Sequence, residues 1–258
     1  MRHTERIFYV AGLGLLPGRA GSWALAPVSR SCFSTLLPSV MTTQPPLADF
    51  LALPSTPAAV KGLAFVKSQA SAPVYNHSVR SFVLARLQAQ QQGLVLGRDY
   101  DEELLFLACI FHDMGLTELG NGPQRFEVEG ADVAVKFLTD NGFSAAQADR
   151  VWLAIALHTS NGIAERREPL VRLTKVGIGL DFGGPNSAFV SEAQATQLFA
   201  AYPRLHMARC LADLIVTQCQ QPSKAPRYTP AAEMVRERTT GPRTTLLEMQ
   251  ATTGRWGN

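Results

Sequence analysis

The chain has 258 residues, of which 46% are hydrophobic and 17% are charged, and its net charge is +3. This composition is that of a globular protein with enough apolar residues for a sizeable core. The small net charge gives no reason to expect a nucleic-acid partner. No apolar run reaches the roughly 18 residues that a membrane-spanning helix needs, so no membrane partner is expected either.

The cysteines form no CxxC pair, which argues against a disulfide framework or a cysteine-based zinc site. A reducing, cytoplasmic compartment fits this pattern. The four residues are Cys32, Cys109, Cys210 and Cys219.

The first 45 residues differ from the rest of the chain. They hold several Arg and Ser, a short apolar stretch and a single acidic residue, Glu5. A cleavable signal or organelle-type transit segment has this composition, and so does translated sequence upstream of a second start at Met41. We expect residues 1–45 to be a poorly ordered extension, either a mis-called start or a targeting segment.

From about residue 46 onward the apolar residues follow a helical pattern. The segment 56–70 opens with a Thr N-cap followed by Pro, and 99–115 opens with an Asp/Glu capping pattern. The segments 144–160 and 191–202 both begin with a Ser-x-x-Gln capping box. Further helices are expected at 74–93, 125–142, 168–184, 205–221 and 229–240.

No segment of useful length alternates with a period of 2, and no Asn-Gly turn lies between two strand-like runs. We therefore expect an all-α fold, a single helical bundle of about eight or nine helices. One domain over 46–240 and a C-terminal tail over 241–258 are expected, because no repeat or linker divides the chain. The apolar segment 205–221 fits either the core or the interface of a homo-oligomer.

Residues with metal-binding side chains lie in, or at the end of, several apolar helical runs. Three of the five histidines do so, His77, His112 and His158. Asp113 follows His112 directly, and Asp181 closes another apolar run. Each residue alone fits an ordinary structural role, but inward-facing His and carboxylates on separate helices are the way a bundle builds a metal site. Imidazole and carboxylate together suit one divalent ion, with zinc favoured and iron or manganese as alternatives.

The ordered set H…HD…D resembles the HD-domain superfamily of metal-dependent hydrolases. The segments "YNHSVRSF", "HDMGLTE", "RFEVEGADVAVKFL" and "ALHTSNGIAER" are most similar to its cyanamide-hydratase-like branch. The resemblance covers roughly residues 55–220 and implies an HD-type helical bundle, and His158 matches a further His that this branch carries near the site. The metal ligands that the resemblance implies are His77, His112, Asp113 and Asp181.

For a cyanamide-hydratase-like enzyme, metal-activated water would add to a small nitrile-type substrate such as cyanamide and give urea. A proton must then reach the substrate nitrogen, and His158 is the first candidate for its donor because imidazole titrates near neutral pH. Thr159 or Asn161 is expected to orient the substrate. Glu118 is a candidate proton shuttle, although a solvated loop acid fits its position as well.

Two other functions stay open. The first is an HD-domain phosphohydrolase acting on a nucleotide or another phosphate ester, which needs cations on the phosphate oxygens. Many phosphodiesterases of the superfamily carry Lys soon after the HD-x-G segment, whereas this chain has Leu116 there and its next cation is Arg125. Arg80, which lies near the face of His77, or Lys175 is a candidate for binding such a substrate. The second is a non-catalytic helical module, against which the intact His-Asp set argues.

Overall fold

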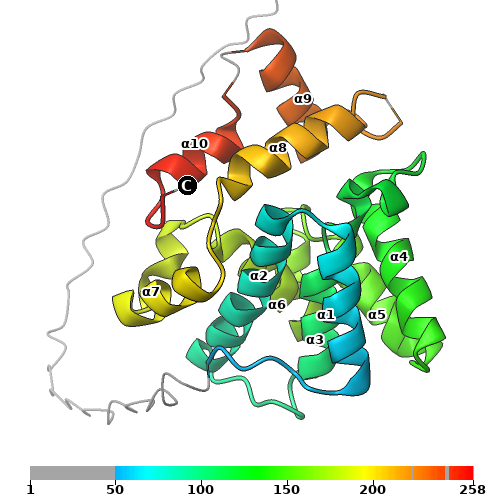
Figure 1. Ribbon diagram of the computed structural model, residues 1–258, viewed down its shortest axis with the longest axis vertical. Helices are drawn as coiled ribbons and strands as arrows, with labels where there is room; N and C mark the ends of the chain where they lie inside the picture. The colour runs from blue at the N-terminus through cyan, green and yellow to red at the C-terminus, as the bar shows by residue number, and fades with distance from the viewer. Residues whose placement is uncertain (1–49, 222, 242–243, 258) are drawn as a thin grey trace, which may run out of the picture. The chain divides into compact units, whose positions relative to one another are not determined.

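The computed structural model describes residues 50–221, 223–241 and 244–257, and the extension predicted at 1–45 lies outside them. The described residues form ten α-helices and four 3-10 helices, and no strand is assigned among them (Figure 1). The all-α prediction is confirmed. The α-helices are α1 (Pro57–Gln69), α2 (Ala72–Gln91), α3 (Glu102–Phe111), α4 (Phe126–Asp140), α5 (Ala145–Ala156), α6 (Pro169–Leu180), α7 (Glu192–Ala201), α8 (Met207–Gln218), α9 (Pro230–Thr240) and α10 (Leu246–Thr253).

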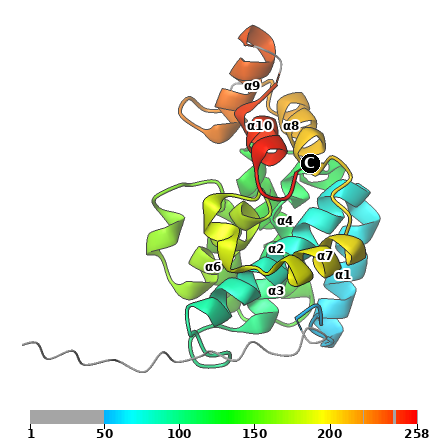
Figure 2. The same ribbon diagram turned by 90° about the vertical axis from the view of Figure 1, so that its left-hand side faces the viewer.

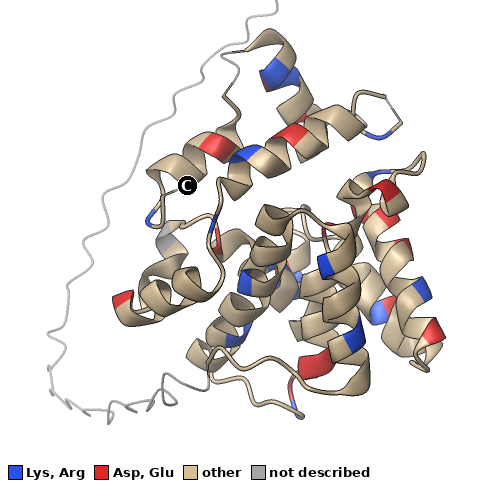
Figure 3. Ribbon diagram, in the orientation of Figure 1, with Lys and Arg blue, Asp and Glu red and all other residues tan. Residues whose placement is uncertain are grey.

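Four short 3-10 helices connect these elements: η1 (Met114–Leu116), η2 (Glu118–Gly120), η3 (Ala164–Arg166) and η4 (Pro185–Phe189). Among the described helices, none is both long enough and apolar enough to cross a membrane. Basic and acidic positions are interspersed over the helices (Figure 3).

The residues predicted to begin helices form hydrogen-bonded N-caps. Thr56 accepts a bond from the third residue of α1, and complete capping boxes at Ser144 and Ser191 open α5 and α7. The capping pattern predicted at Asp99 is shifted, because α3 begins at Glu102 with Asp101 as its N-cap. Asp99 instead accepts a bond from the loop backbone at Val95.

The centre of the bundle is α3, which packs against α1, α2, α5 and α6. Every residue from Leu104 to Phe111 is buried. The crossing of α2 and α6 is close, because a Cβ on Gly177 would lie 2.3 Å from the carbonyl oxygen of Ser81. Glycine is therefore required at this point, and the crossing brings the end of α6 against the middle of α2.

The last three α-helices form a separate layer, which we call the C-terminal layer, α8–α10. It lies over one end of the bundle, where α8 contacts α2 and η1 (Figures 1 and 2). The apolar face predicted at 205–221 is buried within the chain, with Met207, Leu211 and Ile215 in a second hydrophobic cluster. The segment predicted as a tail, 241–258, contains α10, which a Thr-x-x-Glu capping box opens.

Candidate metal centre

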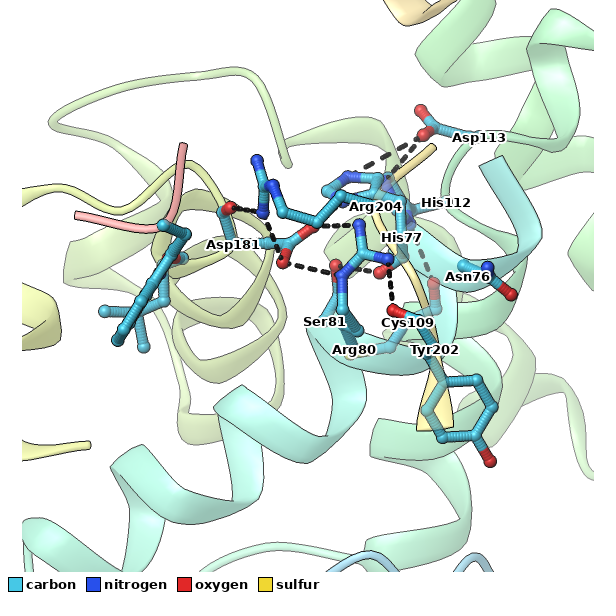
Figure 4. Close-up of polar contacts among 12 residues, drawn as sticks. Asn76, His77, Arg80, Ser81, Cys109, His112, Asp113, Asp181, Tyr202 and Arg204 are labelled. Carbon is cyan, nitrogen blue, oxygen red and sulfur yellow. Dashed lines mark hydrogen bonds and ion pairs between the residues drawn. The ribbon is translucent and has the colours of Figure 1, made fainter. Parts of the chain in front are cut away.

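Three predicted site residues meet at one end of the bundle. His77 lies within α2, His112 ends α3, and Asp113 begins the turn into η1. All three are buried, and their ligand atoms lie within 4.8 Å of one another. Figure 4 shows the carboxylate of Asp113 directed at both imidazoles. Such a group could hold a metal ion.

The turn after the cluster depends on a close backbone approach. A Cβ on Gly115 would lie 1.8 Å from the carbonyl oxygen of Phe126 at the start of α4. Any larger residue would push η1 away from α4 and move Asp113 with it. This is the structural reason for the glycine in the segment "HDMG".

Hydrogen bonds fix the same tautomer in all three buried histidines. In each ring Nδ1 faces an oxygen that can only accept, so Nδ1 carries the proton and Nε2 of the neutral imidazole keeps its lone pair. Such bonding of the second ring nitrogen is typical of metal-ligating histidine. The three bonds are each 2.7 Å long and run from His77 to Asp181, from His112 to the carbonyl of Cys109 and from His158 to the carbonyl of Ile155.

The Oδ2 atom of Asp113 is buried and has no hydrogen-bond partner. It lies 3.0 Å from Nε2 of His112 and 3.9 Å from Nε2 of His77. A carboxylate oxygen that faces two nitrogen lone pairs is repelled by them unless a cation lies between. The residues present therefore fit a divalent ion with mixed N and O ligands.

The electrostatics of the pair also favour positive charge at this point. Burial alone would raise the pKa of the Asp113 carboxyl, but the neighbouring His112 outweighs burial and lowers this pKa. Burial likewise opposes the charged form of His112, yet Asp113 raises the pKa of that imidazole. A proton or a metal ion between the two side chains is therefore stabilised.

Asp181, predicted as the fourth ligand, lies on the other side of His77. Its Oδ2 accepts bonds from Nδ1 of His77 and from Nη2 of Arg80, both 2.7 Å long, and its Oδ1 accepts from Nε of Arg80 at 2.8 Å (Figure 4). Arg204 adds a contact of 3.2 Å to Oδ1. Burial would raise the pKa of Asp181, but Arg80 and His77 outweigh burial and hold this pKa well below its usual range. Asp181 thus lies outside the cluster of ligand atoms formed by His77, His112 and Asp113, and it orients His77; its role as a ligand stays a prediction.

Arg80, predicted to bind substrate, lies behind Asp181. Its side chain is completely buried. Its guanidinium donates to Asp181 and to the backbone carbonyls of Tyr202 and Pro203, at 2.9 and 3.1 Å. These bonds engage all three of its nitrogens, so Arg80 positions Asp181 and does not face a substrate.

A cavity of about 430 Å³ opens above the cluster, and its lining includes His158, Thr159 and Asn161. The ring of His158 lies 5.0 Å from that of His112 in an edge-on arrangement. Burial and the neighbouring His112 lower the pKa of His158 to about 4. Because its Nδ1–H is already used, neutral His158 presents a lone pair and accepts a proton before it can donate one.

Glu127 was not singled out from the sequence. It is completely buried at the start of α4, where Arg125 donates to its Oε1 at 2.7 Å and Thr159 at 2.5 Å. The bond from Arg125 outweighs burial and lowers the pKa of Glu127. The hydroxyl of Thr159 is thus bound to Glu127 and does not point freely at a substrate. An acid in the first turn of a helix gives no distinguishing signal, because the helix dipole favours it there in any protein.

Glu118, predicted as a proton shuttle, is exposed on η2. It lines a different surface cavity, which lies between the η1–η2 turn and α8. The structure therefore does not bring Glu118 to the cluster.

Known proteins support the same interpretation of the cluster. The model of the HD domain family matches residues 74–194. Cyanamide hydratases DDI2 and DDI3 of Saccharomyces cerevisiae are each 25% identical to this chain over 157 residues, which covers 60% of this chain and 69% of each relative. The predicted resemblance to the HD superfamily and its cyanamide-hydratase-like branch is confirmed, and residues 74–194 are the part of this chain that matches the HD domain model.

Proposed function

We propose that this chain is a metal-dependent hydratase that adds water to a nitrile-type substrate, of which cyanamide is the simplest candidate. The observation that carries the proposal is the convergence of two imidazole lone pairs and an unpartnered carboxylate oxygen at the base of a cavity. The similarity to cyanamide hydratases supports this reaction over other HD chemistry.

His77, His112 and Asp113 would hold the ion through Nε2, Nε2 and Oδ2. Zinc is the first expectation, and iron or manganese suits the same ligands. When bound, such an ion polarises the nitrile and lowers the pKa of water. Asp181 and Arg80 orient His77 from behind, since a carboxylate bound to Nδ1 fixes the tautomer and the ring plane.

His158 moves the proton in this proposal. Its Nε2 accepts a proton from the attacking water and returns it to the substrate nitrogen, so that water adds across the C≡N bond without another reactant. A pKa of about 4 makes the protonated ring a strong acid for the second step. The buried carboxylate of Glu127 lies close enough to favour the charged form of His158. Thr159 and Arg125 hold that carboxylate in place.

Metal content and product analysis of the full chain test the proposal. We expect about one divalent ion per chain, formation of urea from cyanamide, and loss of both in His112→Ala. Bound metal with phosphate release from a nucleoside monophosphate, and no hydration of any nitrile, would replace the hydratase by a phosphohydrolase. Absence of metal from the wild-type chain after incubation with zinc, iron or manganese would refute the metal centre.

A further inference from the structure

The cavity is much larger than cyanamide requires. Its volume of about 430 Å³ falls in the range of roughly 300–1,000 Å³ in which proteins bind organic ligands. Cyanamide has only a few atoms and would contact the cluster alone. The rest of the cavity needs an explanation in terms of a longer substrate.

One face of α6 lines the cavity from the cluster outward. Phe182 follows the helix at the cluster end, where its ring lies 5.4 Å from that of His77. Ile178, Gly179 and Lys175 continue the same face at helical spacing, and all of them line the cavity. Lys175 is seven residues from Phe182, which corresponds to about 10 Å along the helix axis. A substrate that reaches both ends of this face is therefore about that long.

The opposite wall belongs to the C-terminal layer and is mainly apolar. Leu211 and Ile215 of α8, Met234 of α9 and Leu247 of α10 line it. These side chains accommodate hydrocarbon, while Glu233, Glu237 and Gln250 add polar groups to the same wall. The middle of the substrate is therefore expected to be apolar.

Lys175 is the lysine or arginine side chain that lines the cavity, and it has no partner within the described residues. Its ammonium takes part in no hydrogen bond or ion pair there, while burial lowers its pKa and the nearby Glu165 offsets part of that effect. The two acids on the opposite wall are engaged, Glu233 by Arg236 at 2.6 Å and Glu237 by the backbone N–H of Leu246 at 3.0 Å. A half-buried cation without a partner is costly, and an anionic ligand would offset that cost.

We propose that the substrate is an organic nitrile with an apolar body and an anionic group, such as a carboxylate, that binds Lys175. The nitrile end of this assignment rests on the proposed function, whereas the anion end rests on Lys175 and the cavity. Arg80 cannot supply the anion site, because its guanidinium is engaged behind His77.

The test compares a linear ω-cyano carboxylate about 10 Å long with its neutral primary amide of the same shape. The full chain with its divalent metal is assayed for kcat/KM on both, and for cyanamide in parallel. We expect wild type to prefer the carboxylate by about tenfold or more, and Lys175→Met to lose that preference. Lys136→Met is the matched control, because Lys136 is 78% exposed and pairs with Asp140 on the surface of α4; it should keep the preference.

Calorimetric binding of the corresponding saturated carboxylate, which lacks the nitrile, separates the two proposals. Hydration of cyanamide without a preference for the anionic nitrile would overturn the inference and leave the hydratase proposal standing. If no nitrile is hydrated, the proposed function fails. In that case, carboxylate binding that weakens about tenfold in Lys175→Met would still support the anion site, and binding unchanged by this substitution would overturn it.

Discussion

The two walls of the cavity come from different parts of the chain and have different chemistry. The cluster wall lies within the residues that match the HD domain model, where buried His and Asp side chains are held by hydrogen bonds to backbone or to arginine. The C-terminal layer lies beyond the matched residues and presents mostly apolar side chains. In the proposed function the metal chemistry is assigned to the cluster wall, whereas the proposed substrate contacts are shared between Lys175 of α6 and the apolar side chains of the C-terminal layer.

Asp113→Asn gives the largest expected effect, because it acts on the cluster wall at the unpartnered oxygen. The amide keeps the shape but loses the charge that a divalent ion needs, so we expect metal binding to fall and hydration to drop about a thousandfold or more. The metal-free protein should also lose stability, because the Asp113 carboxylate favours the protonated form of His112 in the fold. Thermal unfolding with and without chelator measures the stabilisation by metal and the stability of the metal-free protein. A variant that keeps its metal and its activity would exclude Asp113 as a ligand.

Asp181→Asn should differ from Asp113→Asn in its effects on stability and metal binding, because Asp181 is paired with two arginines. Its loss of charge leaves Arg80 and Arg204 buried without their anion, which costs about 3–5 kcal/mol of unfolding free energy. Metal affinity should fall about 10- to 100-fold through His77, less than in Asp113→Asn. Denaturant unfolding and competition with a chelator measure the two effects. Equal losses of metal in both variants would restore Asp181 as a direct ligand.

The ion pairs of Asp181 also predict how the free energy of unfolding depends on pH. The folded-state pKa of Asp181 lies below its value in the unfolded chain, so its ion pairs stabilise the fold at neutral pH. This contribution is lost as the pH falls below about 4, where the unfolded chain takes up the proton. Unfolding free energies of wild type and Asp181→Asn should therefore converge in acid. Parallel curves down to the acid transition would argue against the depressed pKa.

The sequence predicted the helices and the ordered His and Asp set because these depend on local signals. Capping residues and apolar periodicity act within a few residues, and they place His77, His112 and Asp113 on buried helix faces. The hydrogen bonds of Asp181 depend on the close crossing of α2 and α6 at Gly177. This crossing brings Asp181 to Arg80, which lies about a hundred positions earlier in the chain. Local patterns do not determine such a crossing, so the sequence predicted Asp181 as part of the set but not the hydrogen bonds that it forms.

The C-terminal layer was harder to predict for a related reason. The helix α10 has only eight residues, and a helix this short is stable only through its packing. Its contribution to the cavity wall follows from tertiary contacts with α8 and α9. Sequence patterns therefore located the cluster and the helices α8 and α9, but not the way in which α8, α9 and α10 form the wall opposite the cluster.

His158 should give a pH profile that differs from that of an exposed histidine. Its folded-state pKa of about 4 is lower than the unfolded value of about 6.5. The proton-accepting form thus persists in mildly acidic solution, and we expect kcat/KM to fall only as the pH approaches 4. The same shift makes the fold less stable as the pH decreases from about 6.5, because the unfolded chain binds the proton first. An acid limb near pH 6.5 that disappears in His158→Gln would contradict this protonation state.

Gly179→Leu should give the smallest effect on activity, because it changes only the space available to substrate between the two walls of the cavity. Gly179 lines the cavity between Lys175 and Phe182, and a Cβ there meets no atom within 4 Å. Replacing a glycine within a helix by leucine is expected to stabilise α6 by roughly 0.5–1 kcal/mol, because glycine disfavours the helical conformation. We therefore expect unchanged metal content, an equal or higher melting temperature, and a KM for the long anionic nitrile that rises several-fold more than the KM for cyanamide. Equal changes for the long and short substrates would show that the outer cavity does not select substrate, and the difference between the two walls would then be one of packing alone.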